Sequence, residues 1–118
     1  MDARIPLRLI SPQDLSALRS DQEVALLLEA PRAHPVPSGM VTLAEFMPAP
    51  TGHLAECGCC KGRGAVSEAL DHLFQARIRG RSPWFKQVLG VTHSGLAREA
   101  ITTALANDPL TRSRFRLA

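Results

Sequence analysis

The chain has 118 residues and a net charge of +3 at pH 7, with 45% apolar and 21% charged side chains. This size and balance are typical of one globular domain with a modest core of its own. No apolar run approaches the roughly 18–20 residues that cross a bilayer, which excludes a transmembrane helix from the expected structure and predicts no membrane partner. The first residues have no basic stretch ahead of a long apolar one, so we expect no secretory signal.

Charge is unevenly distributed along the chain. Through Cys59 there are four basic and seven acidic side chains, and from Cys60 onward there are ten basic and four acidic. Two interpretations stay open: solvated helix faces, or a basic surface for an anionic partner. With one tryptophan, four phenylalanines and no tyrosine, base stacking has little support. We therefore expect no nucleic-acid partner.

The first thirty residues predict a strand, a helix and a second strand. Residues 5–10 indicate a strand near a sheet edge, because Pro6 cannot donate a backbone hydrogen bond. Ser11-Pro12-Gln13-Asp14 is typical of a helix start, and a short helix to about Arg19 should follow. Residues 24–28 form a compact apolar run and predict a buried strand.

An irregular segment follows. Residues 31–50 hold five prolines and one glycine, which predicts non-repetitive structure with a short extended piece over residues 40–46. Residues 53–56 then lead into the cysteines.

The second half predicts a helix, a strand and a helix. Apolar residues at helical spacing predict the first helix over residues 65–79, ended by Gly80, and residues 87–92 predict the strand. Asn107-Asp108-Pro109 ends the second helix, whose apolar stripe is Ala97, Ala100, Ile101, Ala104 and Leu105. This order indicates one α/β domain over residues 1–118, with a small, mostly parallel sheet flanked by helices.

All three cysteines lie in the run Cys57-Gly58-Cys59-Cys60, followed by Lys61-Gly62-Arg63-Gly64. Nearby positive charge favours thiolates, and thiolates are preferred ligands of zinc and monovalent copper. Three crowded cysteines are unsuited to a disulfide framework, and we expect a reducing, cytoplasmic location. The alternative is a set of free thiols at a turn.

Three sulfur ligands need one more donor to complete a tetrahedral zinc site. His53, four residues before Cys57, is the nearest candidate. Glu56 and His93 are alternatives, and two chains could share one metal ion in a homodimer.

Three further residues are candidate ligand contacts. His93 follows a predicted strand, where α/β folds place ligands, although an isolated histidine is more often structural. Lys61 and Arg63 could form an anion-binding turn at a helix N-terminus, or their charges could simply stay in water.

From Cys57 onward, the chain resembles the nucleotide-binding domain of the CobW family of metal-trafficking GTPases, relatives of the HypB and UreG metallochaperones. That family has a C-x-C-C metal motif, then a helix, then a strand that ends in a Glu-Thr-Thr-Gly turn. Thr92-His93-Ser94-Gly95 falls at that turn, after Pro83-Trp84-Phe85-Lys86-Gln87-Val88 at the family's Pro-Pro-Phe-Asp-Arg-Val position. Asp108-Pro109-Leu110 and Arg114-Phe115-Arg116-Leu117 follow in register.

The resemblance covers the second half of the chain and implies a reduced P-loop-NTPase-like domain. In that domain, residues 1–30 would be a degenerate strand-helix-strand, residues 31–56 the proline-rich segment, and residues 57–118 the metal motif with its helix-strand-helix.

The residues that would hold nucleotide differ from the family pattern. A family member has Gly-x-x-x-x-Gly-Lys-Ser/Thr after its first strand, where backbone N–H groups and the lysine hold phosphates. Here residues 11–18 contain no glycine or lysine, and Asp14 brings negative charge to that position. Thr92 replaces a carboxylate that would help to hold magnesium, and no Asn-Lys-x-Asp motif is present. We expect no catalytic residues, no nucleotide-binding residues and no enzymatic activity.

Two functions of different classes follow. The first is a non-catalytic cytoplasmic protein that binds zinc, or a similar ion, through the C-x-C-C motif and is related to CobW-type metallochaperones. The second is a protein–protein interaction module, an accessory subunit without metal or nucleotide activity, whose basic second half supplies the docking surface.

Overall fold

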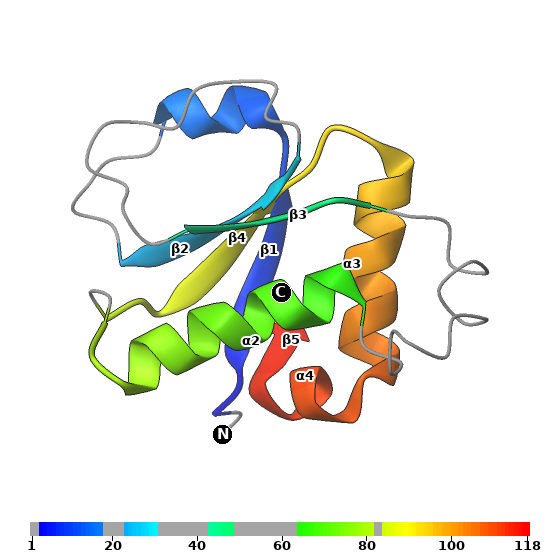
Figure 1. Ribbon diagram of the computed structural model, residues 1–118. Coiled ribbons are helices and arrows are strands. Elements are labelled where there is room, and N and C mark those ends of the chain that lie inside the picture. Colours follow the sequence, from blue (N-terminus) through cyan, green and yellow to red (C-terminus); the bar gives the residue numbers. More distant parts are fainter. Residues whose placement is uncertain (1–2, 18–22, 31–42, 49–63, 82–83) are drawn as a thin grey trace.

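The computed structural model describes residues 3–17, 23–30, 43–48, 64–81 and 84–118 (Figure 1). Five strands form one sheet in the order β3-β2-β4-β1-β5, and each neighbouring pair is parallel. The predicted α/β class is confirmed. The elements in chain order are β1 (Ile5–Ile10), the 3-10 helix η1 (Pro12–Ala17), β2 (Val24–Glu29), β3 (Leu43–Phe46), α2 (Ala65–Ile78), β4 (Gln87–Val91), α3 (Gly95–Asn107), α4 (Pro109–Arg114) and β5 (Phe115–Leu117).

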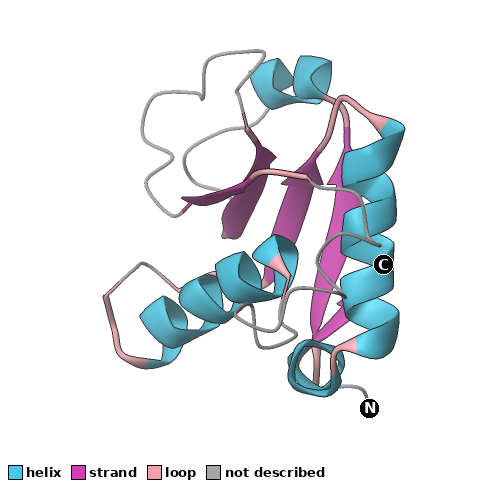
Figure 2. Cartoon of the chain, turned by 45° about the vertical axis from the view of Figure 1, so that its right-hand side comes forward, coloured by secondary structure: helices cyan, strands magenta, loops and turns pink. Residues whose placement is uncertain are grey.

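The two faces of the sheet are covered differently. Helices α2 and α3 share one face, where they enclose the larger core cluster, and Figure 2 shows them as the two long helices beside the strands. Leu15 of η1 packs on the other face, in a smaller cluster with Val24, Leu26, Leu28, Leu89 and Val91. A strand covered on both faces is apolar at successive positions, and all six residues of β2 are buried.

Residues 5–10 form a strand near the sheet edge, as predicted, but not the edge strand itself. Strand β1 lies between β4 and β5, one strand in from the edge. The backbone groups of successive strand residues point to opposite neighbours. The carbonyl of Leu7 points away from β4, because it accepts a hydrogen bond from Ala118 N, which follows β5. The nitrogen of Pro6, one residue earlier, therefore points toward β4. The β1–β4 register begins only at Leu7↔Val88. Pro6 is therefore accommodated at the end of a ladder inside the sheet.

The helix predicted after the first strand is a 3-10 helix, η1, as far as the described residues extend. Its first turn is closed by Asp14, whose backbone N–H donates to the Ser11 carbonyl at 3.0 Å. The extended piece predicted within the proline-rich segment contains β3. Residues 31–42 and 49–50 of that segment lie outside the described residues.

The predicted helix-strand-helix is confirmed in α2, β4 and α3. Helix α2 stops as expected at Gly80, which has φ +70°. Two hydrogen bonds close its end, from Arg81 N to Ala76 O at 2.9 Å and from Gly80 N to Arg77 O at 3.4 Å. This pairing is the Schellman motif, in which glycine adopts the left-handed conformation at low cost.

The structure adds two elements for which sequence analysis assigned no structure, α4 and β5. Asp108 ends α3 and also caps α4, because its side chain accepts from Leu110 N at 3.1 Å and Pro109 takes the first helical position. Strand β5 pairs with β1 from Ile5↔Phe115 to Leu7↔Leu117. Among the described ranges, no helix combines the length and apolar character that crossing a membrane requires.

Helix α3 approaches the central strand β4 closely at Gly90. A Cβ atom at this position would lie 3.2 Å from Ile101 Cδ1, 3.2 Å from Leu9 Cδ2 and 3.3 Å from Leu7 Cδ2. Leu7 and Ile101 are fully buried, so neither can swing away into solvent. The absence of a side chain at Gly90 sets the distance between helix and sheet.

We expect Gly90→Ala to lower the free energy of unfolding by about 1–3 kcal/mol, because the new methyl group overpacks the core. Urea denaturation, monitored by circular dichroism, measures this loss of stability. Gly95→Ala is the matched control, since the nearest atom to its Cβ is Arg98 Nη2 at 3.8 Å. Equal stability of the two variants would contradict the close approach.

Candidate carboxyl-edge site

Three strands end side by side at the carboxyl edge of the sheet. Val91 of β4 is in register with Ile10 of β1 and Leu28 of β2. In open parallel sheets, ligands bind beyond these ends, where the strands lead into loops and helix N-termini. Glu29 is the last residue of β2, and His93 and Ser94 follow β4 directly. These residues form the carboxyl-edge cluster.

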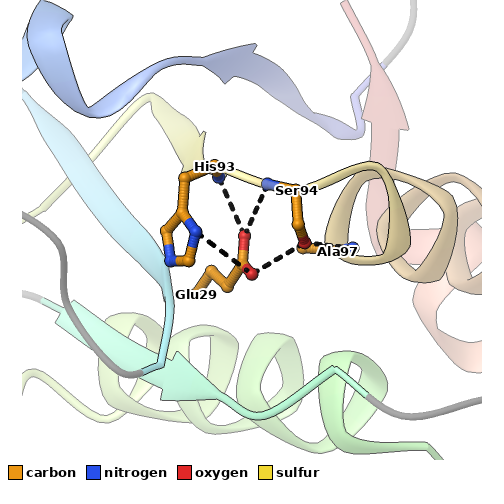
Figure 3. A network of polar contacts seen from close by, with 4 residues as sticks. All are labelled: Glu29, His93, Ser94 and Ala97. Carbon is orange, nitrogen blue, oxygen red and sulfur yellow. Dashed lines mark hydrogen bonds and ion pairs between the residues drawn. The ribbon is translucent and has the colours of Figure 1, made fainter.

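The carboxylate of Glu29 is the centre of this cluster (Figure 3). Its Oε1 accepts from the backbone N–H of His93 at 2.8 Å and from that of Ser94 at 3.2 Å. Its Oε2 accepts from the Ser94 hydroxyl at 2.8 Å. The Glu29 side chain is only 4% exposed, so these bonds replace the water it loses on folding.

The same carboxylate stabilises the start of α3. Ser94 is the N-cap residue, and its Oγ accepts from Ala97 N at 3.2 Å. A negative charge beside the first turn of a helix is favourable because the unpaired N–H groups there carry partial positive charge. Glu29 thus fills the position that an external anion would otherwise take.

His93 lies beside the Glu29 carboxylate and is partly exposed. Its Nδ1 is 3.6 Å from Glu29 Oε2, and its side chain is 34% exposed. Backbone and side chain of His93 therefore both face one buried carboxylate. The arrangement orients an accessible imidazole at the sheet edge, which suits it to contact a ligand.

A second carboxylate closes the turn after β1. Asp14 Oδ2 accepts from the backbone N–H and from the hydroxyl of Ser11, each at 3.1 Å. The backbone N–H and the hydroxyl of Ser11 are thus both engaged by a side chain of the chain itself.

Of the site residues predicted from sequence, the structure describes His93 and places it beside Glu29. The other residues, Cys57, Cys59, Cys60, His53, Glu56, Lys61 and Arg63, lie outside the described ranges. Within those ranges, no three His, Cys, Asp or Glu side chains come together as a metal-ligand group. The predicted metal site therefore stays a prediction.

Glu29 is the residue that sequence analysis missed. The available signal was an acid directly after five apolar residues of a predicted buried strand. Such an acid marks the carboxyl end of a strand, but its partners come from residues 64 and 65 positions later in the chain.

Comparison of the chain with protein-family models, with curated proteins and with solved structures finds no match.

We expect Glu29→Ala to lower the free energy of unfolding by about 3 kcal/mol, because the N–H groups of His93 and Ser94 lose a charged acceptor in a buried setting. Glu23→Ala is the matched control. The Glu23 side chain is 51% exposed in its ion pair with Lys86, so its loss costs about 1 kcal/mol or less. Urea denaturation measures both, and similar losses would contradict the central role of Glu29.

Proposed function

We propose that this is a non-catalytic cytoplasmic metal-binding protein, related to CobW-type metallochaperones, that holds zinc or another thiophilic ion through Cys57, Cys59 and Cys60. The observation that carries the proposal is the run of three cysteines within four residues in the connection between β3 and α2. Thiolates at this density favour zinc or monovalent copper over harder ions such as magnesium or calcium.

The described start of that connection supports the proposal. Glu29 of β2 is in register with Phe46, the last residue of β3, and Ala30 N donates to Phe46 O at 2.8 Å. The connection that carries the cysteines thus leaves the sheet next to the carboxyl-edge cluster. Ligand sites in α/β proteins are built from connections at this edge.

The donor set fits a thiophilic ion. Three thiolates and one nitrogen or oxygen complete a tetrahedral zinc site. His53 is the nearest candidate in sequence, and Glu56 and His93 are the alternatives. A carboxylate beside the imidazole, as Glu29 is beside His93, is the arrangement that orients metal-binding histidines in proteins.

Elemental analysis of untagged protein purified without chelator tests the proposal. We expect about one zinc or copper ion per chain, or half that if two chains share a site. The triple variant Cys57→Ser, Cys59→Ser, Cys60→Ser should lose it. Metal at about 100 times its Kd should stabilise the wild type by about 2.7 kcal/mol and leave the triple variant unchanged.

Histidine variants identify the fourth ligand. His53→Ala and His93→Ala are compared with His72→Ala, which changes an exposed residue in the middle of α2. Replacing the histidine that ligates the metal should weaken metal binding, whereas His72→Ala should not. An absence of bound metal, with three freely reactive thiols, would overturn the proposal.

The proposal includes the absence of nucleotide hydrolysis. Two features after β1 support this absence. Asp14 already binds the backbone N–H and the hydroxyl of Ser11, and the helix that follows, η1, is a 3-10 helix of six residues. Phosphate sites after a first strand rely on free N–H groups at the start of a regular helix.

We expect no saturable heat when GTP and magnesium are titrated into the protein, because Asp14 already binds the backbone N–H and the hydroxyl of Ser11 after β1. Isothermal titration calorimetry measures it, with zinc as the positive control on the same sample. Saturable binding of GTP that Asp14→Ala strengthens would show that the β1 turn holds phosphate after all.

A further inference from the structure

A basic-aromatic patch lies at the amino edge of the sheet, opposite the carboxyl-edge cluster. It is formed where α2 ends and the chain approaches β4, on the left of Figure 1. Trp84 is 57% exposed and Ile78 is 55% exposed, although both are large apolar side chains. The patch consists of Arg77, Ile78, Arg79, Arg81, Trp84 and Lys86.

The tryptophan of this patch is held in place. The guanidinium carbon of Arg77 lies 3.6 Å from the centroid of the Trp84 ring and 5.4 Å from that of Phe85. Arg77 Nε donates to the Phe85 carbonyl at 2.8 Å, so the guanidinium is itself fixed. Burial lowers the pKa of Arg77 from its ordinary value, although arginine stays charged at neutral pH. An exposed aromatic ring that is fixed in advance loses little entropy on binding.

The cations beside the ring are positioned by the end of α2. Arg79 is the C-cap residue, and Arg81 follows Gly80 in the Schellman motif, with its N–H bonded to Ala76 O at 2.9 Å. Their backbones are thus fixed while their side chains are exposed. Lys86 pairs with Glu23 at 3.3 Å, but among the described residues no carboxylate pairs with Arg79 or Arg81.

We propose that the basic-aromatic patch docks an acidic segment of a partner protein, one that carries an aliphatic or aromatic side chain among its carboxylates. Tryptophan and arginine dominate the energetics of protein interfaces, and the exposed Trp84 ring provides the apolar anchor of the patch. Arg79 and Arg81 provide positive charge that an acidic segment complements.

Two other classes of partner fit the patch less well. Single-stranded nucleic acid stacks on successive aromatic rings, whereas this patch has one, and Arg77 already covers one face of it. Membrane-surface segments bury a continuous apolar face, whereas Ile78 and Trp84 are the patch's two large apolar side chains.

Trp84 is the chain's single tryptophan, so its fluorescence reports on this patch alone. The protein is tested against an array of random peptides of four classes: acidic peptides that contain leucine or phenylalanine, acidic peptides without apolar residues, neutral peptides and basic peptides. We expect the array to retain the protein on acidic peptides that contain leucine or phenylalanine. The strongest peptide should then shift the Trp84 emission saturably, and labelled with fluorescein it should gain anisotropy.

Two charge-matched variants locate the binding. Arg79→Gln with Arg81→Gln should weaken the peptide at least about tenfold. Arg8→Gln with Arg98→Gln removes the same charge from exposed positions in β1 and in the first turns of α3, and should leave affinity unchanged. Trp84→Ala should weaken peptide binding by a similar factor, as measured by the anisotropy of the labelled peptide. Circular dichroism verifies that each variant is folded.

Four outcomes would overturn the proposal: no retained peptide, retention independent of acidic residues, equal losses in the two arginine pairs, or a tighter response to anionic phospholipid vesicles or oligothymidine. The triple cysteine-to-serine variant should bind the peptide normally, because the patch contains no proposed metal ligand. Docking and metal binding therefore succeed or fail independently.

Discussion

The buried carboxylate of Glu29 is the interaction on which the carboxyl edge of this protein depends. It joins the end of β2 to the turn after β4, and it does so through two backbone N–H groups and the N-cap hydroxyl of α3. A buried charge is tolerated only with such a full set of donors. The bonds fix the direction in which α3 leaves the sheet, and Gly90 then lets that helix pack closely against β4.

The uneven layering of the fold separates two surfaces of different chemistry. Both long helices cover one face, and α2 runs from the connection that carries the cysteines to the basic-aromatic patch. The carboxyl edge exposes His93 beside the buried Glu29, and the amino edge exposes Trp84 among cations. A protein that received an ion at one edge and docked a partner at the other would keep the two activities physically apart. Part of the basic excess in the second half of the chain is concentrated at one place. Arg77, Arg79, Arg81 and Lys86 lie at the end of α2 and just beyond it.

The sequence placed His93 just after a strand, and the structure confirms that position. His93 follows a strand, and strand ends are where α/β proteins place ligands. The roles of Glu29 and Trp84 could not be predicted from the sequence, and the reason is the same for both. An acid that ends an apolar run, or a tryptophan before a strand, has no meaning until its partner is known. Those partners are the backbone of His93 and Ser94 for Glu29, and the guanidinium of Arg77 for Trp84.

The sequence by itself determined the α/β class, the core stripes of α2 and α3, and the stop at Gly80, because side-chain periodicity and glycine conformation act within a few neighbouring residues. Only the tertiary structure decided the strand order, the interior place of β1, and the pairing of the three-residue strand β5 with it. Pro6 favours an edge by its local chemistry, yet the register between β1 and β4 begins just beyond it. Strand order depends on hydrogen bonds between segments far apart in the chain, and no local pattern of side chains encodes which segments will meet.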